Sequence, residues 1–446
     1  MRFENINQQS QRENRKEEAL DEQWFERFSR AGSFEDYDYL EGEKKYREQE
    51  RKKFLEEAAR NPNLGYPKLE NLDFAGKEKE LLDLKKEILE KESSDAVKKA
   101  YRWKLNEKIA QLRMLKASKD GDDKKFAKYS RFIYGMPEKE IFSYDIAAVR
   151  AAMEARENSD DLRIQFALKR LKETVSFSNI EKSEINDKFL PEKKRVLEHP
   201  FGEEKKFHAD EIQNEFRAAL EELKIEGWDV TIKDNIAAIS VSQEKKQVKI
   251  PESRKLTETG LKQLIVHEIE THVLRRENGE RSKLKLLGLG LDRYIAGEEG
   301  ISTYEEQKIG GADEFSGLDG HLAVSLALGM DGRKRDFREV FNILRDYFFI
   351  KSNEKDLAKA WEKAKNAAWN RCVRTFRGTT CQTTGVCFTR DMVYREGNIN
   401  TWIVLSGNPD EEAKFSLGKY DPANPRHAWI LEQANISEDD LETLEK

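Results

Sequence analysis

The sequence has few cysteines, few prolines and no long apolar run. Its three cysteines (Cys372, Cys381 and Cys387) are too few and too clustered for a disulfide framework. An apolar stretch of roughly eighteen residues, as a membrane span requires, is absent. The first residues lead into a polar stretch without an apolar core, which argues against a secretory signal. We therefore expect a cytoplasmic protein with free thiols.

The sequence also lacks an excess of either charge. Its 446 residues include 80 Lys and Arg and 86 Asp and Glu, and the formal net charge is only -6. The two signs are interleaved, as on a solvated helical surface. Because no basic stripe is separated from its acids, nucleic acid is not an expected partner. Nothing in the composition indicates an oligomeric state.

The pattern along the chain changes three times. Leucines and isoleucines recur at helical spacing between residues 81 and 115. We predict a charged helical or disordered segment (1–60), a helical domain (61–225), a domain with strands and a histidine motif (226–400), and a C-terminal extension (401–446).

The best strand signals precede the histidine motif. Three short segments rich in Val and Ile are separated by polar turns: 228–233, 237–241 and 247–250. They predict a small antiparallel sheet in an otherwise mostly helical α+β fold. An edge strand of such a sheet can pair with an extended peptide through main-chain hydrogen bonds.

The most informative motif is residues 266–276, where two histidines follow one another at a spacing of five. The helix that carries them should begin near Thr257 or Thr259 and end at Asn278–Gly279. On a straight α-helix His267 and His272 would point ~140° apart. A π-type turn of i→i+5 bonds would align them, and such turns occur mostly at functional sites. Two unrelated helix histidines are the alternative.

The motif contains the side chains of a one-zinc hydrolase. A catalytic zinc takes three protein ligands and keeps one position for water. We predict His267, His272 and Glu299 as the ligands, with Glu298 as the alternative third ligand. Glu268 is the expected general base, which takes a proton from the attacking water.

Further carboxylates lie downstream of the predicted third ligand. Glu305 and Glu306, one to two turns beyond Glu299, are candidates for orienting the imidazoles. A plain surface position for both is the alternative. His321 and His427 are expected to be ordinary histidines of the surface or core.

At these residues the sequence resembles a known family. Residues 267–275 (HEIETHVLR) with 299–301 (EGI) look like the HExxxH metallopeptidase family that includes the microtubule-associated tyrosine carboxypeptidase and bacterial proteins with a QEGLA motif. Weaker similarities extend the resemblance over roughly residues 50–400, in the segments 61–67, 130–137, 374–378 and 388–397.

The resemblance implies a zincin-like metallopeptidase fold with one Zn²⁺ on His267, His272 and Glu299 and with Glu268 as the base. It implies a peptide or protein C-terminus as the substrate. Glu270 departs from the family, since the HEIGTH form has glycine there. An added carboxylate near the metal would alter the charge of the site.

A carboxypeptidase also needs a cation for the terminal carboxylate and a donor for the oxyanion. Arginine pairs with carboxylates through two parallel hydrogen bonds. The candidates are Arg374, Arg377 and Arg390 for the carboxylate, and Tyr304 and Tyr394 for the oxyanion. Structural ion pairing or packing is the alternative for all five.

Two function classes follow from these observations. The first is a zinc-dependent carboxypeptidase. The second is a non-catalytic helical interaction protein with a degenerate or structural metal site, in which residues 1–60 carry the interaction. The sequence names no particular substrate.

Overall fold

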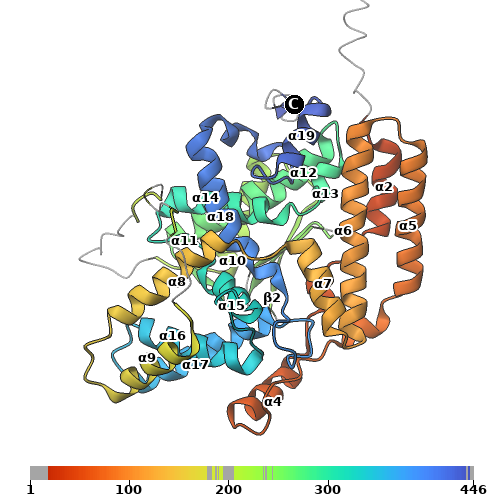
Figure 1. The fold of residues 1–446 in the computed structure, drawn as a ribbon. Coiled ribbons are helices and arrows are strands. Elements are labelled where there is room, and N and C mark those ends of the chain that lie inside the picture. The colour runs from red at the N-terminus through yellow and green to blue at the C-terminus, as the bar shows by residue number, and fades with distance from the viewer. Residues whose placement is uncertain are drawn as a thin grey trace, which may run out of the picture.

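The computed structural model describes residues 19–177, 183–185, 188, 190–193, 205–234, 236, 239–243, 245–437, 440 and 441. These residues form a mostly helical α+β fold, as the sequence predicts (Figure 1). No helix within these ranges combines the length and apolarity needed to cross a bilayer.

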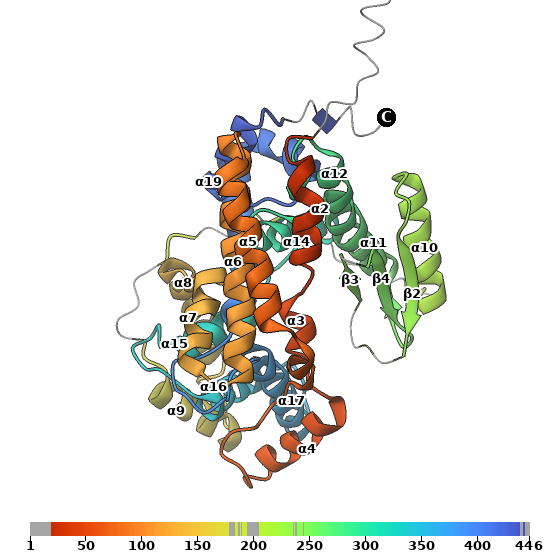
Figure 2. The ribbon, with the colours of Figure 1, turned by 90° about the vertical axis from the view of Figure 1, so that its right-hand side faces the viewer.

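The first helices are α2 (Glu22–Ala31), α3 (Asp36–Tyr39), α4 (Lys44–Leu55), η1 (Pro67–Asn71), α5 (Phe74–Lys91), α6 (Asp95–Lys119) and α7 (Asp123–Tyr134). Of these, α2, α5 and α6 stand side by side at one flank of the molecule, and α4 lies at its lower end (Figures 1 and 2). Leu81, Leu84 and Ile88 of the predicted stripe are buried. Residues 1–18 of the predicted N-terminal segment lie outside the described residues, and much of 19–60 is helical.

A second group of helices lies below the centre of Figure 1. It comprises α8 (Lys139–Glu154), α9 (Leu162–Thr174), α15 (Leu318–Leu328), α16 (Phe337–Lys351) and α17 (Leu357–Thr375). Phe54 of α4 is fully buried in this core, with its ring 5.1 Å from Phe337 and 4.9 Å from Phe341. The charged N-terminal segment is thus anchored to the core by an aromatic side chain.

The small sheet and its covering helix lie on one side of the molecule (Figure 2). The elements are β1 (Phe207–His208), α10 (Ala209–Glu222), β2 (Asp229–Lys233), β3 (Ser240–Ser242), β4 (Gln247–Pro251) and β5 (Lys255–Leu256).

The three-stranded sheet has the order β2-β4-β3. β3 and β4 pair antiparallel, as predicted, and β1 and β5 form a separate antiparallel pair. β2 pairs parallel with β4, which the prediction of a wholly antiparallel sheet missed. The reason is that the β3–β4 hairpin places β4, and not β3, next to β2. β3 is therefore an edge strand.

The remaining helices carry the histidine motif and the elements around it. They are α11 (Glu258–Ile265), η3 (Val266–Val273), α12 (Leu274–Arg281), α13 (Leu286–Leu289), α14 (Ile295–Gly310), η4 (Thr389–Met392), α18 (Val393–Gly407), η5 (Pro409–Leu417) and α19 (Pro425–Gln433). Thr257 caps α11 by accepting from Gly260 N, as predicted.

The motif helix does not stop at Asn278–Gly279, and α12 continues to Arg281. A Cβ on Gly279 would lie 2.3 Å from the backbone nitrogen of Gly288. Gly279 therefore serves the close approach of α13, and its role as a helix stop was wrongly predicted.

Candidate metal centre

The two histidines lie in a π-helical segment, which confirms the predicted local loosening of the helix. η3 spans Val266–Val273 and continues from α11 into α12. Ile269 and Val273 are fully buried in the apolar cluster of the sheet and α10. The π-helix thus keeps an apolar face on the sheet while its i→i+5 bonds bring the two histidines to one side.

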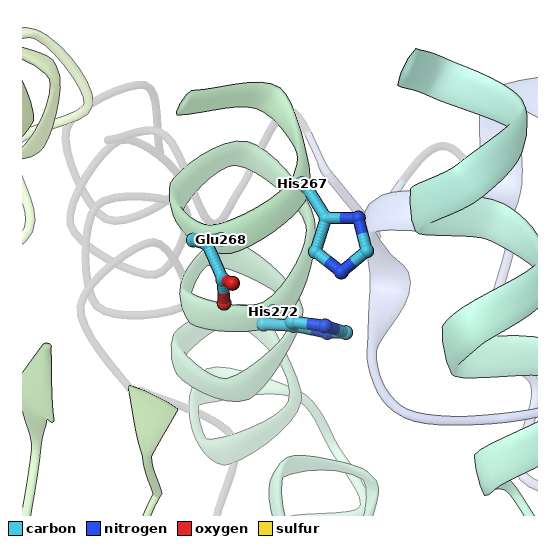
Figure 3. Close-up of side chains that lie close together, drawn as sticks. All are labelled: His267, Glu268 and His272. Atoms are coloured by element: carbon cyan, nitrogen blue, oxygen red, sulfur yellow. The ribbon is translucent and has the colours of Figure 1, made fainter. Parts of the chain in front are cut away.

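The motif side chains converge (Figure 3). The imidazole rings of His267 and His272 have centroids 4.8 Å apart and planes at 86°. One potential ligand atom from each of His267, Glu268 and His272 lies within 4.8 Å of the others. Two imidazoles and a carboxylate at this separation form a donor set that suits a divalent metal ion.

The neighbouring helix α14 brings Glu299 to the same place. Glu299 Oε2 lies 4.0 Å from His267 Nε2. Its neighbour Gly300 allows α14 to pack closely on α18, because a Cβ there would lie 2.3 Å from the carbonyl oxygen of Gly397. Glu299 is the acid of α14 whose position suits the third ligand.

The alternative third ligand, Glu298, is already occupied by other partners. Its Oε1 lies 2.9 Å from His272 Nδ1, and Arg275 donates to its Oε2 over 2.6 Å. Lys419 also donates to Glu298, and all these side chains are largely buried. Glu298 therefore orients the His272 ring through its Nδ1 atom.

Glu306 forms an ion pair with the other histidine, without the hydrogen-bond geometry of the Glu298 contact. Its Oε1 lies 2.9 Å from His267 Nδ1, whereas Glu305 pairs with Lys308 over 3.1 Å. Because a carboxylate lies at each Nδ1 atom, the Nε2 atoms of both imidazoles remain available to bind a metal ion. Of the two acids considered from sequence, Glu306 contacts the site, since it lies two turns after Glu299 on the same helical face.

The electrostatics of the site favour a cation. Burial opposes the charged imidazole of His267, but Glu306, Glu268 and Glu299 outweigh it and raise its pKa to about 9. Burial also opposes the Glu298 carboxylate, yet Lys419 and Arg275 hold its pKa well below its usual range. Four carboxylates thus surround the two imidazoles, and a divalent cation would help to balance their charge.

Glu268 and Glu270 differ sharply in surroundings. Glu268 is buried, and burial raises its pKa against the opposing effect of His267 and His272. Glu270 is exposed, and its pKa is raised by partial burial and by Glu305 and Glu222. The residue that departs from the family thus lies among other carboxylates of the surface.

The three predicted arginines lie in one cluster with acidic partners. Arg374 donates to both oxygens of Asp391 over 2.8 and 2.9 Å, and Arg390 donates to Asp36 over 2.7 Å. The guanidinium carbon of Arg377 lies 4.1 Å from the centroid of the Tyr37 ring. The structure therefore brings these three cations together.

The two predicted tyrosines are placed differently. Tyr394 lies on α18 one turn before Gly397, which contacts Gly300 beside Glu299, and the Glu299 carboxylate, followed by burial, raises its pKa. The Arg374 guanidinium lies 5.7 Å from its ring, which connects the centre to the arginines. Tyr304 instead donates to Glu412 over 2.7 Å and packs on Trp402.

Several residues of the site were not found from sequence. Lys419 and Arg275 support Glu298, and Asp36 and Tyr37 join the arginines. Lys419 and Tyr37 are remote in sequence from the motif and follow no spacing rule. Arg275 follows His272 by three residues, a helical interval that places it near the same partner.

Comparison with known proteins adds one match. Searches of curated proteins and of solved structures gave no match. The family model described as microtubule-associated tyrosine carboxypeptidase matches residues 52–196 and 191–421. These residues include the histidine motif, α14 and the three arginines, and on this match the chain belongs to the microtubule-associated tyrosine carboxypeptidase family.

Proposed function

We propose that this protein is a zinc-dependent carboxypeptidase that removes residues from the C-terminus of a peptide or protein. The main support is the convergence of His267, Glu268 and His272, together with the Glu299 carboxylate 4.0 Å from His267 Nε2. Membership of a family named for a carboxypeptidase supports the reaction class.

The residues present fit a single zinc ion. His267, His272 and Glu299 would hold it, which leaves one position open as catalytic zinc sites require. When bound, the ion acts as a Lewis acid that polarises the scissile carbonyl and acidifies water. Glu306 and Glu298 keep the two imidazole rings in orientation.

The side chains around the centre account for the proton transfers. Glu268 takes a proton from the attacking water and delivers it to the leaving amine. Its burial raises its pKa and so strengthens it as a base. We infer that Tyr394 donates to the developing oxyanion, because it lies on α18 one turn before Gly397, which contacts Gly300 beside Glu299.

The substrate's position follows from the neighbouring elements. The arginines receive the terminal carboxylate, as guanidinium groups pair well with carboxylates. The edge strand β3 contacts η3 and offers main-chain groups to an extended peptide.

Peptide-release assays test the proposal. The full chain, loaded with Zn²⁺, is incubated with a C-terminal peptide library that includes peptides ending in tyrosine, and released residues are identified by mass spectrometry. We expect release by the native chain, loss of about 100-fold or more in Glu268→Gln, and loss on chelation that Zn²⁺ restores. Retained zinc without release of any residue would favour the non-catalytic interaction protein instead.

A further inference from the structure

The arginines of α17, η4 and the segment between them form a larger group than the sequence indicated. We call it the arginine cluster and define it as Arg371, Arg374, Arg377 and Arg390. Arg371 and Arg374 come from α17, Arg390 comes from η4, and Arg377 follows α17. The carboxylates that pair with the cluster are Asp391 and Asp36.

Among the described residues, the pairing leaves one cation, Arg377, without a close ion-pair partner. Arg371 and Arg374 share Asp391, and Arg390 pairs with Asp36. Within the described part of the chain, no carboxylate lies within 4.0 Å of Arg377, and its buried Nε has no acceptor. A buried N–H without an acceptor is costly, so Arg377 is suited to receive an anionic group from outside the chain.

Tyr37 contacts three members of the cluster. The guanidinium carbons of Arg377 and Arg390 lie 4.1 and 4.2 Å from the centroid of its ring. Its hydroxyl donates to Asp391 over 3.2 Å and accepts from Arg374 over 3.3 Å. The ring is thus fixed at its hydroxyl, and the ring in turn holds the plane of the Arg377 guanidinium.

Tyr37 lies outside the part of the chain that matches the family. It lies in α3, ahead of the residues 52–196 and 191–421 that match the family. The Arg374 guanidinium lies 5.7 Å from the Tyr394 ring, and Tyr394 lies on α18 one turn before Gly397, which contacts Gly300 beside Glu299. A segment outside the family match therefore contributes to the surroundings of the centre.

We propose that Tyr37 is a positioning residue that holds Arg377 as the receptor for the substrate's terminal carboxylate. The proposal rests on the proposed carboxypeptidase function and deepens it by naming the receptor and its support. Arg374 and Arg390 already donate to aspartates, whereas Arg377 has no carboxylate within 4.0 Å among the described residues.

The experiment compares two probes that differ only at the C-terminus. The probes are acetyl-Gly-Ser-Gly-Ser-Gly-Tyr as the free acid and as the amide. Their dissociation constants are measured by calorimetry with zinc-loaded full-length Glu268→Gln protein, so that cleavage does not interfere. We expect the acid to bind about tenfold or more tightly than the amide, since hydrogen bonds to charged groups are among the stronger ones.

Variants made in the Glu268→Gln protein test which residues cause the preference for the acid. Arg377→Gln should bring the ratio of the two dissociation constants, amide over acid, close to one. Tyr37→Leu should reduce the ratio about threefold or more, whereas Tyr37→Phe, which keeps the ring, should retain most of it. Tyr39→Leu, on the same short helix, is the matched control and should leave the ratio unchanged.

The outcomes separate this proposal from the proposed function. The proposal is overturned if the two probes bind equally, if neither binds, or if the preference for the acid survives Arg377→Gln. It is also overturned if Tyr37→Leu weakens the binding of both probes equally, because a merely structural role would have that effect. Selective binding of the acid without hydrolysis by the native chain would support the receptor and refute the peptidase.

Discussion

At the scale of single residues, the carboxylates behind the histidines shape the candidate centre. Glu298 and Glu306 each lie 2.9 Å from an Nδ1 atom, and Glu298 is itself held by Arg275 and Lys419. Such partners fix the ring orientation and raise the basicity of a metal ligand. The consequence is that the metal affinity depends on residues that do not bind the metal.

Glu306→Gln should weaken zinc binding about 10- to 100-fold, because His267 loses its charged partner. Competition with a chromophoric zinc chelator measures the affinity. Glu305→Gln is the matched control on the same helix and should change it little, since Glu305 pairs with Lys308. Equal effects of the two changes would contradict the assigned orientation of His267.

His272→Ala should remove most of the bound zinc, because a three-ligand site loses one of its donors. Elemental analysis of protein purified without chelator measures the zinc content. The exposed His208, which caps α10, supplies the control variant His208→Ala, which should retain zinc. Undiminished zinc in His272→Ala would refute the ligand assignment.

At the scale of elements, the π-helix allows one segment to pack on the sheet and to present both histidines to α14. Ile269 and Val273 must lie against the sheet, and His267 and His272 must face α14. A regular α-helix meets the first demand, but it separates the histidines. The i→i+5 turn meets both, which explains why the spacing of five is compatible with one metal ion.

The packing of α14 on α18 sets the position of Glu299. Gly300→Ala would place a Cβ 2.3 Å from the Gly397 carbonyl oxygen and 2.5 Å from Thr401 Oγ1. We expect a loss of about 1–3 kcal/mol in the free energy of unfolding, together with weaker zinc binding as Glu299 is displaced. Urea denaturation measures the first quantity and chelator competition the second.

Gly407→Ala is the control for this change. Nothing lies within 4 Å of the Cβ that it would add at the end of α18. It should leave zinc binding unchanged and keep or slightly increase the stability, since alanine favours helix over glycine. If both glycine variants behaved alike, close helix packing would not explain the position of Glu299.

At the scale of the whole molecule, a buried charge network joins the helical core to α18, the helix that packs on α14. His321 of α15 is fully buried, with Nδ1 2.6 Å from Asp145 of α8 and Nε2 3.3 Å from Glu396 of α18. Arg395 donates to Asp145 over 2.9 Å. His321, expected from sequence to be an ordinary histidine, is thus a link between three helices.

This network predicts a pH-dependent stability. Burial opposes the charged imidazole, but Asp145 and Glu396 outweigh it and raise the pKa of His321 to about 9. The stabilisation is complete below the unfolded-state pKa near 6.5 and is lost as the pH rises through about 9. The stability difference between the native chain and His321→Gln should therefore shrink over this range, by at most about 3 kcal/mol.

Urea denaturation at pH 6, 7.5 and 9.5 measures this difference. His208→Gln serves as the control, because His208 is exposed and its removal should give a difference that depends little on pH. A difference between the native chain and His321→Gln that stays constant from pH 6 to 9.5 would show that His321 is not charged in the folded state.

Local features of the sequence were enough for the motif and its immediate surroundings. The interval between His267 and His272 predicted the π turn, Thr257 predicted the helix start, and Gly300 predicted a close helix approach. Each of these depends on neighbours within a few residues, where helical geometry determines which side chains share a face.

The sequence by itself determined the histidine motif, the helical turn that carries it and the mostly helical class of the fold. Only the tertiary structure decided that β2 runs parallel to β4, that Lys419 supports Glu298 and that Tyr37 joins Arg377. The physical reason is that these contacts join segments far apart in the chain. Packing and buried charge select such partners, and no periodicity in the sequence records them.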